Sequence, residues 1–150
     1  MNEERITLPV PSDSEGFVSF DCPLCGFRFK LNAQEVQEAP ESQLYCPYCG
    51  IPSDQVSFIS QDVIEAGVRR LEDLVRQRIN AYANRLARSS RGSRAIEFKP
   101  GRPLPPVPEK PLVEDESLVA IEFPCCSKHV KTFQSKETAP VYCPYCGVNH

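Results

Sequence analysis

The longest regular hydrophobic pattern in the chain lies between residues 61 and 92, and it is helical. Apolar residues recur there at steps of three and four, which places them along one face of an α-helix of about 28 residues. This apolar stripe comprises Ile64, Val68, Leu71, Val75, Ile79, Tyr82 and Leu86. Such a helix spans about 42 Å, which is too long for one small module to cover. We therefore expect the stripe to contact a partner protein or a second copy of the chain.

Short alternating segments flank the helix on both sides and predict strands. They lie at 17–20, 27–30 and 56–59 before the helix, and at 119–121, 130–133 and 141–142 after it. Six of the fifteen Pro residues fall within 99–117 and predict an extended linker. The expected organisation is a flexible N-terminus over 1–15, a first module over 16–60, the helix over 61–92, a Pro-rich linker over 93–117 and a second module over 118–150.

The eight Cys residues form two groups, one in each predicted module. The first contains Cys22, Cys25, Cys46 and Cys49, and the second contains Cys125, Cys126, Cys143 and Cys146. The segments 44–50 and 141–147 are near copies, each with a Tyr-Cys-Pro-Tyr-Cys-Gly core. The chain therefore carries an internal repeat of one small module.

The spacing of the first group suits a metal ion. Two thiolates separated by two residues can bind one ion when the turn between them is tight. Pro after the first Cys presets that turn, and Gly after the second permits the positive φ that closes it. Four such sulfurs make a tetrahedral zinc site. The N-terminus lacks a basic stretch followed by an apolar one, so we expect no signal peptide and a reducing compartment, cytoplasmic or nuclear, where ligands are favoured over disulfides.

The second group departs from this spacing, because Lys occupies position 128. Two interpretations remain open: a site made by Cys126, His129, Cys143 and Cys146, or a degenerate turn that binds no metal. Aligning Cys126 with Cys22 places His129 at the position of Cys25, which favours the first interpretation. Cys125 is then a spare thiol or an alternative ligand. The expected content is two zinc ions per chain.

These Cys turns resemble those of zinc ribbons over residues 17–58 and 118–149, and also those of rubredoxin, which holds iron in similar turns. The resemblance implies a small metal-stabilised α+β fold: two ribbons of short antiparallel sheet, joined by the long helix and the Pro-rich linker. It leaves the function open, because ribbons serve many roles. A rubredoxin-like electron carrier is one of the alternatives that it allows.

Charge distribution adds a further alternative. The chain has a formal net charge of −3, yet residues 61–94 hold eight Arg and four acidic residues. The late cluster Arg85, Arg88, Arg91 and Arg94 has no acidic neighbour and is a candidate nucleic-acid contact, with a solvated or protein-facing helix as the competing interpretation.

Catalytic and membrane functions have little support in the sequence. The longest unbroken aliphatic run is four residues, from Leu118 to Ile121, so no membrane span is expected. There is no recognisable catalytic set and no phosphate-binding Gly-rich loop. We therefore expect a non-enzymatic zinc-binding adaptor without a small-molecule substrate, with a nucleic-acid-binding ribbon protein as the alternative.

Overall fold

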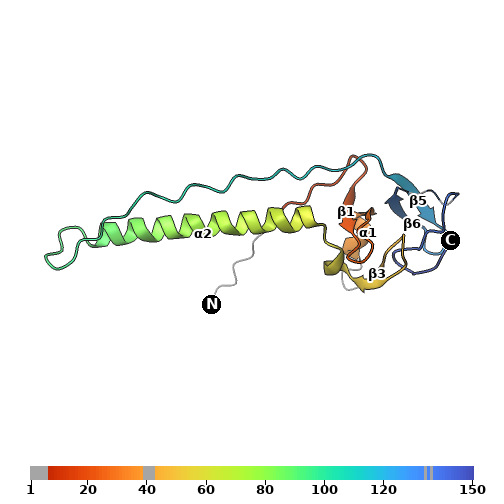
Figure 1. Ribbon diagram of the computed structural model, residues 1–150, viewed down its shortest axis with the longest axis horizontal. Coiled ribbons are helices and arrows are strands. Elements are labelled where there is room, and N and C mark those ends of the chain that lie inside the picture. The colour runs from red at the N-terminus through yellow and green to blue at the C-terminus, as the bar shows by residue number, and fades with distance from the viewer. Residues whose placement is uncertain (1–6, 39–42, 134, 136) are drawn as a thin grey trace. The chain divides into compact units, whose positions relative to one another are not determined.

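A computed structural model describes residues 7–38, 43–133, 135 and 137–150 (Figure 1). The chain divides into two compact units. We call the first the base, made of residues 9–64 and 112–150, and the second the arm, made of residues 65–111 together with residues 7–8. The arm is therefore an insertion between the two halves of the base.

The base contains one four-stranded antiparallel sheet to which both predicted modules contribute. A first hairpin pairs β1 (Phe17–Asp21) with β2 (Arg28–Asn32), and a second pairs β5 (Val119–Phe123) with β6 (Lys128–Thr132). The strand order is β1-β2-β6-β5, so β2 and β6 join the two hairpins through Lys30 opposite Lys131 and Leu31 opposite Val130. The modules are two halves of one sheet.

Smaller elements complete the base. A short helix, α1 (Ala33–Glu38), follows β2, and a two-stranded sheet pairs β3 (Gln43–Tyr45) with β4 (Pro52–Asp54). The strand expected at 56–59 is instead a 3₁₀ turn, η1 (Gln55–Phe58), followed by a single bridge between Ile59 and Phe20. This turn buries Phe58 completely, edge-on against the ring of Phe29 at 5.6 Å between centroids.

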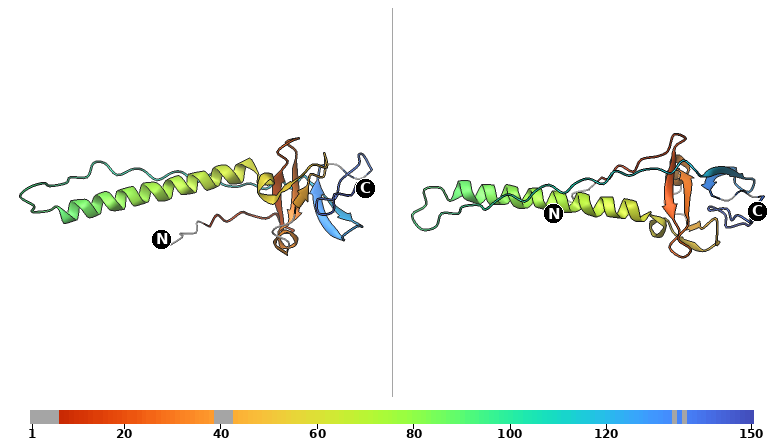
Figure 2. Two further views of the ribbon diagram at one scale, coloured as in Figure 1. Left: turned by 90° about the horizontal axis from the view of Figure 1, so that it is seen from below. Right: turned by 45° about the horizontal axis from the view of Figure 1, so that its top comes forward.

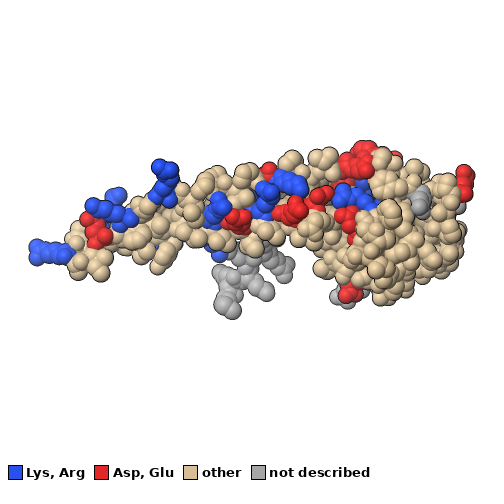
Figure 3. All heavy atoms as spheres, in the orientation of Figure 1, with Lys and Arg blue, Asp and Glu red and all other residues tan. Residues whose placement is uncertain are grey.

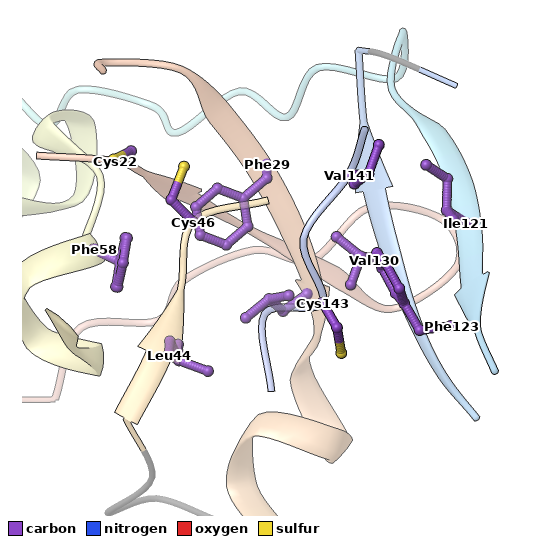
Figure 4. Packing of buried hydrophobic residues seen from close by; sticks show 11 residues of the cluster. Cys22, Phe29, Leu44, Cys46, Phe58, Ile121, Phe123, Val130, Val141 and Cys143 are labelled. Carbon is purple, nitrogen blue, oxygen red and sulfur yellow. The ribbon is translucent and has the colours of Figure 1, made fainter. Parts of the chain in front are cut away.

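The two halves share one hydrophobic core (Figure 4). Phe29, Leu44 and Phe58 come from the first half, and Phe123, Val130 and Val141 come from the second; all six are fully buried. A ribbon alone has too few residues to enclose such a core. The two halves therefore stabilise each other by burying apolar surface together.

Reciprocal contacts show that the halves are related by an approximate twofold symmetry. The Tyr45 N–H donates to the Pro144 carbonyl at 2.8 Å, and the Tyr142 N–H donates to the Pro47 carbonyl at 2.9 Å. The Tyr142 ring also lies against Gly50, as the Tyr45 ring lies against Gly147. A side chain at either Gly would come within 3 Å of the facing ring, so both contacts require Gly.

A buried ion cluster lies where the two hairpins meet. Lys30 and Lys131 are both buried, and each forms an ion pair with Asp13, at 3.4 Å and 2.8 Å respectively. Lys30 also pairs with Glu114 at 3.0 Å. Because buried charges need partners, the two acids hold the segment before β1 and the segment before β5 onto the sheet.

Helix α2 (Gln61–Ser89) begins in the base and forms most of the arm. In its first turn, the N–H groups of Val63 and Ile64 both donate to the Ser60 carbonyl at 3.1 Å. The side chain of Asp62, in the same turn, pairs with Arg28 at 3.1 Å. Among the residues that the structure describes, no helix is both long and apolar enough to cross a bilayer.

The Pro-rich segment returns along α2, as the two views of Figure 2 show. The Asn80 side chain both donates to the Leu104 carbonyl, at 2.9 Å, and accepts from the Leu104 N–H, at 2.8 Å. The Val107 N–H donates to an Asp73 carboxylate oxygen at 2.9 Å. These bonds use polar side chains of the helix and fix the extended segment to its polar face.

Candidate metal centres

Three of the four Cys turns share one backbone conformation. In each, the Gly N–H donates to the carbonyl of the Cys four residues earlier, at 2.8 to 2.9 Å. The Gly residues have φ of 74°, 70° and 71°, at Gly26, Gly50 and Gly147 respectively. Only Gly adopts this conformation readily, which explains why the sequence pattern locates these turns so well.

The first group brings together Cys22, Cys25, Cys46 and Cys49. Their sulfurs all lie within 4.8 Å of one another, with 3.7 Å from Cys22 Sγ to Cys49 Sγ and from Cys25 Sγ to Cys46 Sγ. A tetrahedral ion with bonds of about 2.3 Å places its sulfurs about 3.8 Å apart. Disulfide sulfurs lie about 2.05 Å apart. The group thus has the dimensions of a four-sulfur metal site, and its cysteines are free.

Backbone donors add to the suitability of this site for an ion with thiolate ligands. The Cys25 N–H points to Cys22 Sγ at 3.5 Å, and the Tyr48 N–H points to Cys46 Sγ at 3.4 Å. Such donors favour the charged form of the sulfur. The Tyr48 hydroxyl donates to the Arg28 carbonyl at 2.7 Å, which anchors this turn to β2.

Burial and hydrogen bonding set the protonation of the sulfurs. Burial raises the pKa of Cys46 and of Cys143, the two most enclosed members of their groups. At Cys22 burial acts in the same direction, but the N–H groups of Cys25 and Leu24 outweigh it and lower the pKa. Thiols with a raised pKa hold protons at neutral pH, so metal binding would release protons. The affinity for the metal would therefore decrease as the pH is lowered.

The second group brings together Cys125, Cys126, Cys143 and Cys146, again within 4.8 Å of one another. The sulfur of Cys126 lies 3.5 Å from that of Cys143 and 3.9 Å from that of Cys125. These two separations lie on either side of about 3.8 Å, the sulfur–sulfur distance expected in a tetrahedral zinc site. The structure thus contains two groups of four Cys, each able to hold a metal ion.

His129, which the sequence predicted as a ligand, lies outside this group. It stands within β6 opposite Glu122, and its ring faces Glu35 of α1, with 3.7 Å from Nδ1 to the carboxylate. Its side chain is 49% exposed. The expected set with His129 therefore differs from the structure, in which Cys125, expected as a spare thiol, is the fourth member.

The backbone conformation explains why Cys125, and not His129, is the fourth member of this group. The Ser127 N–H donates to the Phe123 carbonyl at 2.8 Å, the same closing bond that runs from Gly26 to Cys22 in the first half. Ser127, with φ of 55°, therefore stands in the place of Gly26, and Cys126 stands in that of Cys25. Phe123 takes the position of Cys22 and has no sulfur, and Cys125, next to Cys126, completes the group of four sulfurs.

A sequence signal for this arrangement exists, but it depends on strand register. The first loop spans 22–27 between the paired residues Asp21 and Arg28, whereas the second spans only 124–127 between Phe123 and Lys128. A loop of this length contains both adjacent cysteines and ends before His129. Counting residues from the ends of the paired strands therefore locates the four-Cys group, whereas counting the spacing between cysteines does not.

The remaining candidate residues lie on α2 and beyond its end. The apolar stripe residues Ile64, Val68, Leu71, Val75, Ile79 and Tyr82 are exposed, and Leu86 is partly exposed. Arg85, Arg88, Arg91 and Arg94 are exposed as well.

A scan against protein-family models and searches of curated proteins and solved structures returned no match to this chain. The likeness to zinc ribbons therefore rests on the Cys turns and on the short antiparallel hairpins that carry them.

Proposed function

We propose that this chain is a non-enzymatic docking protein, in which a zinc-stabilised base carries an arm that associates with the arm of a second copy. The supporting observation is the apolar stripe of α2, which is exposed from Ile64 to Tyr82 and partly exposed at Leu86, although the Pro-rich segment also packs on α2. The zinc assignment rests on the four-sulfur geometry of both groups. Iron fits the same geometry, as in the electron-carrier alternative, and is distinguished by its visible absorption.

The Pro-rich segment that runs back along α2 (residues 93–111, the return segment) leaves the apolar stripe uncovered. It is bonded to Asp73 and Asn80, which lie on a different face of the helix from Leu71, Val75 and Ile79. Those three apolar side chains remain 47 to 50% exposed. A long exposed apolar stripe on a helix marks an interaction surface. An isolated helix also gains most of its stability from packing such a face.

The stripe is suited to pairing with itself. Counting outward from Val75, the apolar positions recur at the same steps of four, three and four in both directions. An antiparallel pair centred on Val75 would set Leu71 against Ile79 of the second copy. It would likewise set Val68 against Tyr82 and Ile64 against Leu86. Steps that repeat every eleven residues favour a right-handed supercoil over a left-handed heptad coil.

Charges beside the stripe are compatible with this pairing. Glu72 and Arg76 lie on one flank near its centre and pair within the chain at 2.6 Å. In an antiparallel pair the same flanks meet, so each Glu72 would also approach Arg76 of the second copy. Arg76 of the two copies would also approach each other there, and each Arg76 would have a Glu72 of its own chain and one of the second copy as counter-charges.

Sedimentation velocity on the metal-loaded full chain tests the proposal. We expect a dimer that dissociates on dilution. Leu71→Asp with Val75→Asp would place four carboxylates at its centre and weaken association by at least roughly 100-fold. Arg88→Gln with Arg91→Gln, away from the stripe, should leave the dimer intact. A wild-type chain that stays monomeric at high concentration, or a dimer that survives the double Asp substitution, contradicts the proposal.

A further inference from the structure

We propose that a basic cavity at the C-terminal end of α2 binds single-stranded nucleic acid, with a phosphate on its arginines and a base on its aromatic ring. The cavity has a volume of about 420 Å³ and lies entirely within the arm, between the last turns of α2 and the start of the return segment. That volume falls within the range of roughly 300–1,000 Å³ typical of ligand pockets.

Positive charge dominates this region. Arg88, Arg91 and Lys99 line the cavity, against the single acid Glu97. Arg85, Arg94 and Arg102 lie nearby in the sequence, so residues 85–102 hold six basic side chains and one acidic one. Figure 3 shows Lys and Arg gathered at this end of the arm.

Within the described part of the chain, none of these six basic side chains forms an ion pair with an acidic one. A positive charge in the last helical turn offsets the helix dipole, which accounts for Arg88. It does not account for Arg91, Arg94 or Lys99, which follow the end of α2 at Ser89. Arg forks match phosphate oxygens, so the cluster is suited to a polyanion.

An aromatic ring distinguishes this cavity from a simple basic patch. Phe98 lines it beside Pro100 and is 39% exposed. The Phe98 N–H donates to Ser90 Oγ at 2.9 Å, which holds this residue against the end of the helix before any ligand arrives. An exposed ring next to arginines is the combination that binds unpaired bases with their phosphates. An acidic peptide would use the charges but not the ring, and in a duplex the bases are already stacked.

The test measures fluorescence anisotropy of a labelled oligothymidylate with the metal-loaded full chain at several salt concentrations. Each phosphate contact contributes about 0.7 to the salt slope, so Arg88→Gln with Arg91→Gln should lower the slope by about 1.4. The same relation predicts binding about 25-fold weaker at 0.1 M salt. Phe98→Ala should weaken binding on the order of 10-fold with an unchanged slope, because it removes stacking and no charge.

A matched control makes the same charge change elsewhere on the arm. Arg69→Gln with Arg70→Gln should leave binding within roughly twofold of the wild type if the cavity is the site. Circular dichroism checks that each variant keeps its helix. The stripe substitutions at Leu71 and Val75 should not reduce binding, so failure of this proposal and failure of the dimer are distinguishable.

Three results would overturn the inference. The first is no binding at low salt. The second is an equal loss in the Arg69 and Arg70 control, which would place binding on the whole arm. The third is wild-type affinity in Phe98→Ala, particularly if polyglutamate competes as well as the oligonucleotide, which would reduce the cavity to a general anion surface.

Discussion

Replacing Cys125 by Ser tests whether the second Cys group is a four-sulfur metal site. Cys125 is exposed, so the change from sulfur to oxygen disturbs no core packing. Its sulfur lies 3.9 Å from that of Cys126, within a group whose members all lie within 4.8 Å. We expect the purified wild-type chain to contain two zinc ions, and Cys125→Ser to lose zinc from one site only.

The magnitude follows from the number of ligands. A structural zinc contributes about 10–16 kcal/mol of apparent binding free energy at pH 7, so each of four sulfurs carries on the order of 3 kcal/mol. Losing one should weaken the second site roughly 100-fold. Competition with a chromophoric zinc chelator at fixed pH resolves the two sites. Cys49→Ser, an exposed ligand of the first group, should produce a loss of similar size at the other site.

His129→Ala is the decisive companion variant. Because His129 lies outside the group and faces Glu35, its removal should leave both sites at wild-type affinity. If His129→Ala releases one zinc while Cys125→Ser retains both, the four-sulfur assignment is wrong and the ligand set with His129 is restored. A red chain with one iron per site would instead refute zinc and support the electron-carrier alternative.

Two predictions concern the base. Gly50→Ala should destabilise it more than Gly26→Ala: both have positive φ, but only at Gly50 would the new methyl meet the Tyr142 ring, at 2.9 Å. Equal losses in thermal midpoint would contradict the reciprocal packing. Asp13 is buried, which acts to raise its pKa, but the hydrogen bond from Lys131 and two backbone N–H groups lower it to about 2. Its lowered folded-state pKa stabilises the base above about pH 4, by about 2 kcal/mol, and this stabilisation is lost as the pH falls toward 2. Asp13→Asn should thus lower the urea-unfolding free energy at pH 7 by at least that amount, and an unchanged value would refute the argument.

Local features of the fold were predictable from the sequence. The helix expected over 61–92 is α2, which ends at Ser89 where a run of Ser, Arg and Gly begins. Three of the four Cys turns were located because Pro and Gly fix their backbone. Both features depend on residues that are close together in the sequence. Hydrophobic periodicity and Cys spacing reflect such local relations directly.

Features that depend on distant residues were not predictable. The junction of β2 with β6 pairs Leu31 with Val130, and nothing in either strand specifies an edge partner so far along the chain. The return segment is attached to α2 through Asp73 and Asn80, which in the sequence belong to an ordinary polar helix face. The place of Cys125 depended on strand register, which only the paired hairpin reveals.

The base and the arm differ in how far their apolar and aromatic side chains are buried. In the base, Phe29, Phe58 and Phe123 are fully buried, so these rings are core and are not available to a ligand. In the arm, Leu71 and Phe98 are 49% and 39% exposed. The chain leaves the base at residue 64 and returns at 112, and Glu114, in the segment before β5, pairs with the buried Lys30. The hydrophobic core and both Cys groups are therefore made by residues of the base, and the exposed Leu71 and Phe98 belong to the arm.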